Sequence, residues 1–133
     1  MFKTLNLNAI SGDKSKFQAI QEWIAATVNW QQPDTLTDGA TVTWYCNRAY
    51  NTSVTLAGSR TLIVAGAKPG SYGTIEIVQG GSGSYTLTLP SGSKVANAGT
   101  GAITLSTAVG AIDVASFYYD GVNYFWTISL DFT

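Results

Sequence analysis

The chain has 133 residues, of which 45% are hydrophobic, 12% aromatic and only 11% charged, with a formal net charge of −1 and no histidine. This length fits one domain whose core needs neither a disulfide nor a metal, and the single cysteine, Cys46, has no partner in the chain. The 7 basic residues are scattered, which excludes a nucleic-acid partner, and the lack of histidine removes the commonest general base and zinc ligand.

The first 33 residues differ from the rest of the chain. Residues 2–10 alternate weakly and predict an extended arm. An amphipathic helix is expected over residues 13–28, because apolar residues recur there at helical spacing and Pro33 follows. The apolar stripe must be buried, either against the rest of the chain or in a neighbour, and we expect residues 1–33 to attach the protein to a neighbour. The residues assigned to this attachment are Phe17, Ile20, Trp23, Ile24 and Val28.

The sequence carries no recognisable targeting or membrane signal. Residues 1–14 lack a basic start followed by an apolar core, so no secretion signal is expected. The longest apolar stretches fall well short of the ~20 residues that a membrane span requires. We therefore expect no membrane partner and a protein that is made in the cytosol.

Beyond Pro33 the sequence changes to short β-type runs separated by turn residues. This spacing is typical of an all-β sandwich or barrel, and it leaves no room for crossover helices, so antiparallel sheets are expected. The predicted fold is mainly β: an antiparallel β-sandwich or jelly-roll-like body over residues 34–133, with one N-terminal helix. The predicted strands are Ala40–Cys46, Ser53–Leu56, Arg60–Val64, Gly73–Gln79, Ser84–Leu89, Ala102–Leu105, Ala111–Tyr119 and Asn123–Leu130.

Two turn sequences are predicted to close hairpins. Gly80–Ser84 lies between two strand patterns, which favours a hairpin loop over a flexible linker, and it lacks the lysine of a phosphate-binding loop. Asp120-Gly121 is interpreted as a hairpin corner, because the periodic oxygen ligands and closing glutamate of a calcium loop are missing. No metal site and no cofactor is predicted.

Catalytic chemistry finds little support in the sequence. A glycosidase needs two positioned carboxylates; no spacing pairs any of the 8 acidic residues, and Glu76 is interpreted as an exposed strand residue. A serine hydrolase needs a base beside its nucleophile, and the adjacent pairs Ser15-Lys16 and Ser93-Lys94 lack the Ser-x-x-Lys spacing. No catalytic residue is assigned, and a small glycosidase or esterase stays an alternative only if two carboxylates share a cleft.

Aromatic residues are the most distinctive feature of the sequence. They flank the Asp120-Gly121 turn, so antiparallel pairing places aromatic side chains on both faces of a hairpin. One face can pack into the core, and the other can meet a neighbouring subunit or a planar ligand such as a sugar ring. Core or subunit packing is the simpler interpretation, and Trp44-Tyr45 form a similar two-faced pair. The residues assigned to a subunit interface or ligand platform are Tyr118, Tyr119, Tyr124, Phe125 and Trp126.

Several segments, in order along the chain, resemble a β-domain that recurs in bacteriophage virion proteins. The resemblance covers about residues 34–126. Such domains occur on tail fibres, head fibres and capsid-decorating proteins, usually as homotrimers, and are structural or adhesive rather than catalytic. The segments that carry the resemblance are Thr37–Trp44, Val54–Leu62, Pro69–Gly73, Val78–Gln79, Ser84–Pro90, Ala111–Val114 and Phe117–Gly121.

The resemblance implies a non-enzymatic virion structural protein that is assembled in the cytoplasm of the host. Residues 1–33 are too short for the stalk of a fibre subunit, which favours a capsid-decorating, auxiliary or head-fibre homotrimer bound to the capsid shell. The alternative is the receptor- or carbohydrate-binding tip of a tail fibre, with a surface glycan as its ligand.

Overall fold

The computed structural model describes residue 20 and residues 32–133. The chain divides into two units, Met1–Gln32 and Pro33–Thr133, and we call the second unit the β-body. The predicted arm over 2–10 lies outside the described residues. So does the predicted helix over 13–28, with the exception of Ile20.

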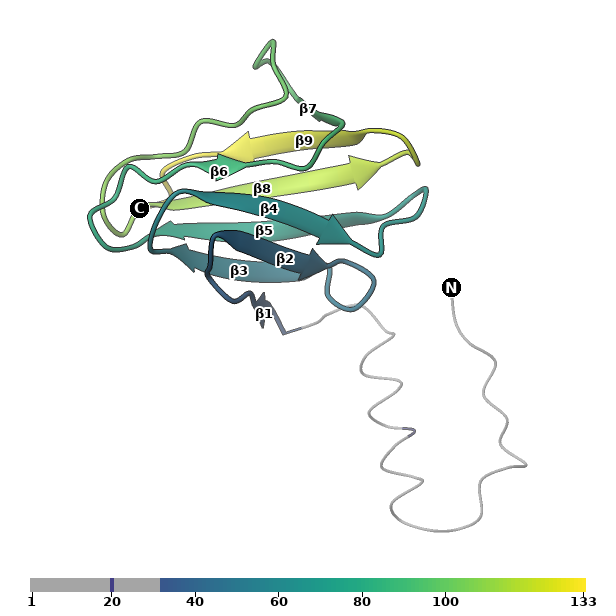
Figure 1. Cartoon of the computed structure of the whole chain (residues 1–133), viewed down its shortest axis with the longest axis horizontal. Coiled ribbons are helices and arrows are strands. Elements are labelled where there is room, and N and C mark those ends of the chain that lie inside the picture. The colour runs from purple at the N-terminus through teal and green to yellow at the C-terminus, as the bar shows by residue number, and fades with distance from the viewer. Residues whose placement is uncertain (1–19, 21–31) are drawn as a thin grey trace. The chain divides into compact units, whose positions relative to one another are not determined.

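Two β-sheets build the β-body (Figure 1). The mainly β character that the sequence predicts is thereby confirmed. The larger sheet has six strands in the order β1 (Asp34–Thr35), β3 (Asn51–Leu56), β5 (Tyr72–Gln79), β8 (Ile112–Tyr119), β9 (Tyr124–Ser129) and β7 (Ser93–Val95). The smaller sheet has three strands in the order β2 (Thr41–Tyr45), β4 (Arg60–Ala65) and β6 (Leu87–Thr88).

The chain alternates between the two sheets from β1 to β6, and most neighbouring strands are parallel. In the larger sheet β3 pairs in parallel with β1 and β5, and in the smaller sheet β4 pairs in parallel with β2 and β6. Strand β7 also lies parallel to β9. Among residues 32–133, only the pairs β5–β8 and β8–β9 are antiparallel, so the prediction of antiparallel sheets is wrong.

The route of the chain explains this difference. A parallel connection that returns to the same sheet usually needs a long crossover, most often a helix. In this protein the crossover is a strand of the other sheet: the chain leaves β3, runs along β4 and comes back as β5. Because packed sheets lie only about 10 Å apart, short loops can connect a strand of one sheet to the next strand in the other sheet. No crossover helix is therefore required.

Alternating apolar residues fill the space between the sheets with one core. Val42 and Trp44 of β2 and Ile75 and Ile77 of β5 are almost completely buried. Trp44 contacts Phe117 of the opposite sheet, with ring centroids 5.1 Å apart and the planes at 81°. Each such aliphatic side chain contributes about 1.5–3 kcal/mol when it is fully buried, so these contacts hold the sheets together.

Several predicted elements are corrected by the structure. The run Ser84–Leu89 forms only the short strand β6, and Ala102–Leu105 forms no strand among residues 32–133, although Leu105 is buried. Gly80–Ser84 joins β5 to β6 in the other sheet, so the predicted hairpin there is wrong. Strands β1 and β7 were not expected.

The hairpin corner at Asp120-Gly121 is confirmed between β8 and β9. The amide of Asp120 donates to the carbonyl oxygen of Asn123 at 3.2 Å. Its carboxylate Oδ1 accepts from the amides of Val122 and Asn123 at 2.8 and 2.7 Å, which lowers the pKa of Asp120. Gly121 has a φ of 104°, which glycine adopts without strain.

Candidate functional site

Three exposed aromatic side chains stand next to one another on the outer face of the six-stranded sheet. Tyr72 of β5 lies opposite Tyr118 of β8, and Tyr118 lies opposite Phe125 of β9. Directly opposite residues point to the same face of a sheet, and these three side chains are 64%, 52% and 42% exposed. We call Tyr72, Tyr118 and Phe125 the aromatic row.

Two further residues extend the aromatic row at its ends. Lys94 of β7 is paired with Phe125 and is exposed. Tyr50, just before β3, has its ring centroid 6.1 Å from that of Tyr72. The outer face therefore offers a line of aromatic rings that ends in one positive charge.

Hydroxyl groups form the next line of side chains on the same face. Thr74 is paired with Ser116, and Ser116 with Thr127. The Oγ1 atom of Thr74 and the Oγ atom of Ser116 are 2.9 Å apart and share a hydrogen bond. The surface beside the aromatic row is thus polar but uncharged.

Two members of the aromatic row, Tyr118 and Phe125, lie on strands whose inner face also carries aromatic residues. Phe117 has its ring centroid 5.6 Å from that of Tyr124 and 5.1 Å from that of Trp126. Tyr119 and Tyr124 stack with centroids 4.4 Å apart. Alternation along β8 and β9 therefore places Tyr118 and Phe125 between inward-facing aromatic residues.

The structure divides the aromatic residues that the sequence assigned to an interface or platform. Tyr118 and Phe125 are exposed on the outer face, whereas Tyr119 and Tyr124 face inward and are half-buried. Trp126 is 1% exposed, and its Nε1 donates to Ser93 Oγ at 3.0 Å. Trp126 is therefore a core residue and is excluded from an exposed platform.

Tyr72 was not assigned to the site from the sequence, because the predicted strand begins one residue later, at Gly73. The available signal was alternation, since the residues two and four positions later, Thr74 and Glu76, also face outward. Of the residues assigned to attachment, only Ile20 lies within the described part of the chain; Phe17, Trp23, Ile24 and Val28 lie outside it.

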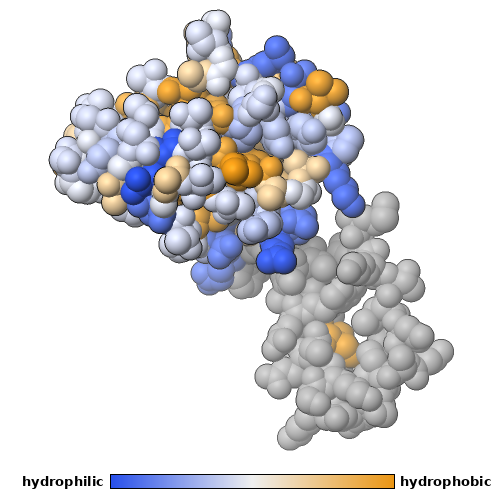
Figure 2. All heavy atoms as spheres, in the orientation of Figure 1, coloured by the Kyte–Doolittle hydropathy of each residue, from blue (hydrophilic) through white to orange (hydrophobic). Residues whose placement is uncertain are grey.

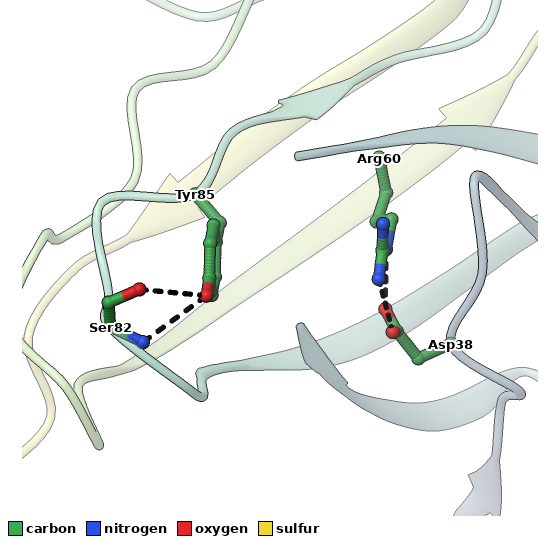
Figure 3. Close-up of polar contacts among 4 residues, drawn as sticks. All are labelled: Asp38, Arg60, Ser82 and Tyr85. Carbon is green, nitrogen blue, oxygen red and sulfur yellow. Dashed lines mark hydrogen bonds and ion pairs between the residues drawn. The ribbon is translucent and has the colours of Figure 1, made fainter. Parts of the chain in front are cut away.

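Other polar groups of the β-body have clear structural partners (Figure 3). Both carboxylate oxygens of Asp38 accept from the Arg60 guanidinium, at 2.9 and 2.7 Å, and this pairing lowers the pKa of Asp38. The hydroxyl of Tyr85 lies 3.2 Å from the donating amide of Ser82 and 3.1 Å from the Ser82 hydroxyl, and these contacts lower the pKa of Tyr85. The first contact fastens the segment before β2 to the start of β4, and the second lies within the connection between β5 and β6.

Buried titratable groups also have structural roles. Asp113 accepts from the amide and hydroxyl of Ser106, both at 2.7 Å, and from the amide of Asp131 at 2.9 Å. The Cys46 thiol donates to the Ala65 carbonyl oxygen at 3.4 Å, and burial raises the pKa of this thiol. Burial likewise raises the pKa of Tyr124. A thiol with a raised pKa is a poor nucleophile at neutral pH.

The surface of the β-body reflects the low charge of the sequence. Figure 2 shows a mostly pale, weakly polar surface over one face, with only small groups of strongly hydrophilic residues. No helix among residues 32–133 has the length and hydropathy of a membrane span. In the same residues, no three His, Cys, Asp or Glu side chains gather in an arrangement suited to a metal ion.

The aromatic row is the candidate functional site of the β-body. Its side chains are exposed and lie directly opposite one another on three neighbouring strands. The polar groups described above, in contrast, are occupied by contacts within the β-body. Comparisons of the chain with protein-family models, curated proteins and solved structures find no match.

Proposed function

We propose that the chain is a non-enzymatic structural protein of a bacteriophage virion, a capsid-decorating homotrimer whose subunits meet through the aromatic row. The observation that carries the proposal is the in-register exposure of Tyr72, Tyr118 and Phe125 on one sheet face. Contiguous exposed apolar residues mark interaction surfaces. Interface cores are enriched in Tyr and Phe and depleted in charged residues, and the aromatic row itself carries no charge.

The virion part of the proposal is supported by the resemblance of residues 34–126 to β-domains of phage particles. The β-body is in this interpretation a two-layer β-sandwich, with Trp44 and Phe117 in contact across the layers. Residues 1–33 attach the trimer to the capsid shell. The protein is then located in the virion and assembled in the host cytoplasm.

The side chains of the aromatic row are suited to protein contact. Tyr and Phe have only two side-chain torsions, so they lose little conformational entropy when they are covered. The inner rings of Phe117, Tyr119 and Tyr124 support the strands that carry the row. The Thr74 and Ser116 hydroxyls beside it can exchange hydrogen bonds across an interface. An interface built here gains apolar burial without the desolvation of paired charges.

The test is the mass of the protein in solution, measured by light scattering. We expect the full chain to have three times the mass of one subunit, and Tyr118→Ser combined with Phe125→Ser to shift it to a monomer with an unchanged circular dichroism spectrum. Ile63→Ser is the matched control, because Ile63 is 45% exposed on the other sheet. A wild-type chain that is monomeric at high concentration contradicts the proposal.

A carbohydrate-binding tip is the second candidate, and the line of hydroxyls beside the aromatic row favours it. Sugar rings stack on aromatic faces while their hydroxyls bond to polar side chains, and Thr74, Ser116 and Lys94 lie within one strand of the rings. The test is binding to a glycan array. If the wild-type chain binds and the Tyr118→Ser/Phe125→Ser variant loses this binding while keeping its oligomeric state, the result supports this candidate over the first.

A further inference from the structure

Strand β2 is the longest edge strand in the described part of the chain. The other edge strands have two residues (β1 and β6) or three (β7), whereas β2 has five. Very short edge strands protect a sheet from pairing with other chains. Strand β2 lacks this protection, since it pairs only with β4 in the three-stranded sheet.

The register shows which backbone groups of β2 face the open side. The carbonyl oxygen of Ala40 accepts from the Thr61 amide, and the Cys46 amide donates to the Ala65 carbonyl oxygen, both at 3.1 Å. Ala40 and Cys46 thus face β4, and because residues of a strand alternate, so do Val42 and Trp44. The N–H and C=O groups of the residues between them, Thr41, Thr43 and Tyr45, face away from β4.

Most of these outward groups have no partner among residues 32–133. The Tyr45 carbonyl oxygen accepts from the amides of Arg48 and Ala49, at 3.0 and 3.2 Å. This leaves the Tyr45 amide and both backbone groups of Thr41 and Thr43 open to a further strand. The spacing of these groups is that of an ordinary β-ladder.

A groove of about 380 Å³ is lined by Thr41, Thr43 and Tyr45 of β2 and by the connecting segment 34–39. That segment contains two acidic residues. Asp38 is paired with Arg60, whereas Asp34 is exposed and has no ion pair within the described residues. The groove therefore lies beside an open hydrogen-bonding edge and includes the exposed carboxylate of Asp34.

We propose that the free edge of β2 binds an extended peptide of another protein by strand addition, with a basic side chain of the peptide beside Asp34. Backbone hydrogen bonds to Thr41, Thr43 and Tyr45 supply the affinity, and the groove selects side chains of the added strand. The exposed carboxylate of Asp34 favours a peptide with a basic residue, which a second copy of β2 does not carry within Thr41–Tyr45. This inference goes beyond the proposed function and does not depend on it.

The decisive variant is Thr43→Pro in the full chain, with Thr43→Val as its matched control. Proline removes the outward amide while the β2–β4 ladder stays intact, and edge strands tolerate proline where the N–H faces outward. The probe is a nine-residue peptide of alternating Thr and Val with a terminal Lys, titrated into isotope-labelled protein and followed by NMR. We expect saturable shifts at Thr43 and Tyr45, retained by Thr43→Val and weakened about tenfold by Thr43→Pro.

Two further measurements hold even if Thr43→Pro fails to fold. The same peptide with alternate amides N-methylated should no longer bind the wild-type chain; equal binding of both peptides overturns strand addition. In the free protein the Thr43 amide should exchange with solvent much faster than the Trp44 amide. Slow exchange at Thr43, or exchange that slows as protein concentration rises, overturns the proposal, because the edge is then already covered. Asp34→Asn should weaken the Lys peptide about two- to fivefold at low salt.

Discussion

Asp113 shows what one buried side chain does in this β-body. It is 1% exposed, and its carboxylate accepts three hydrogen bonds, two from Ser106 and one from the amide of Asp131. It thereby ties a segment without regular structure and the end of the chain to β8. The sequence shows Asp113 within a strand but not these partners, since they lie 7 and 18 residues away along the chain.

We expect Asp113→Ala to lower the free energy of unfolding by about 3 kcal/mol, since it leaves the Ser106 and Asp131 donors without an acceptor inside the protein. Asp113→Asn keeps the shape and one acceptor oxygen, and should cost about half as much. Urea unfolding of the three proteins measures both values. An Asp113→Ala variant as stable as the wild type contradicts the structural role given to this carboxylate.

Individual strands can be predicted from local pattern, but their partners cannot. Strands β2, β4, β5, β8 and β9 begin and end within one or two residues of the predicted runs, because alternation and β-branched residues are local signals. Pairing depends on the sheet to which the chain returns, and the same alternation serves parallel and antiparallel neighbours. Strand β6 is shorter than predicted because the backbone of Tyr85 bonds to the Gln79 side chain, at 2.8 and 3.1 Å, instead of to a strand.

The candidate site could be predicted only in part, because the local pattern does not show which strands pair. Tyr118 and Phe125 belong to one hairpin, so their pairing follows from the Asp120-Gly121 turn. Tyr72 joins them only through the pairing of β5 with β8, two strands far apart in the sequence. The phase of the alternation, which places Trp126 inside and Phe125 outside, is set by the core contacts of Phe117 and not by any local signal.

Packing between the sheets leads to a prediction at Gly73. This residue is buried opposite Phe117, and a Cβ atom there would collide with the buried ring of Trp44. We expect Gly73→Ala to lower the free energy of unfolding by about 1–3 kcal/mol. Gly39→Ala is the control, because its Cβ would meet only the Thr41 carbonyl oxygen at an ordinary 3.5 Å.

The cause of the Gly73 effect can be separated from a general intolerance of alanine in β5. Combining Gly73→Ala with Trp44→Phe replaces the ring that causes the collision with a smaller one. The two changes should then cost less together than the sum of their separate effects, by about 0.5–2 kcal/mol in a double-mutant cycle measured by urea unfolding. Strict additivity would show that the collision with Trp44 is not the cause.

Both sheets of the β-body end in edge strands, which are β1 and β7 in the larger sheet and β2 and β6 in the smaller one. Within the larger sheet, the parallel strands β1, β3 and β5 lead into the antiparallel pairs β5–β8 and β8–β9. The core of the β-body is formed by its own side chains, from both sheets. The aromatic row and the edge of β2 lie on different sheets, so each can be occupied without the other.

The core that residues 32–133 bury among themselves leads to a prediction for the whole chain. Removing residues 1–31 should leave a folded, trimeric β-body, with a free energy of unfolding within about 1 kcal/mol of the full chain, because residues 33–133 form a compact unit with a core of their own. The truncated trimer should no longer sediment with capsids stripped of the protein, since the attachment residues assigned from the sequence are gone. Full-length protein is the positive control. Truncated trimers that still bind capsids would show that attachment belongs to the β-body, and an unfolded truncated chain would show that the first unit completes its fold.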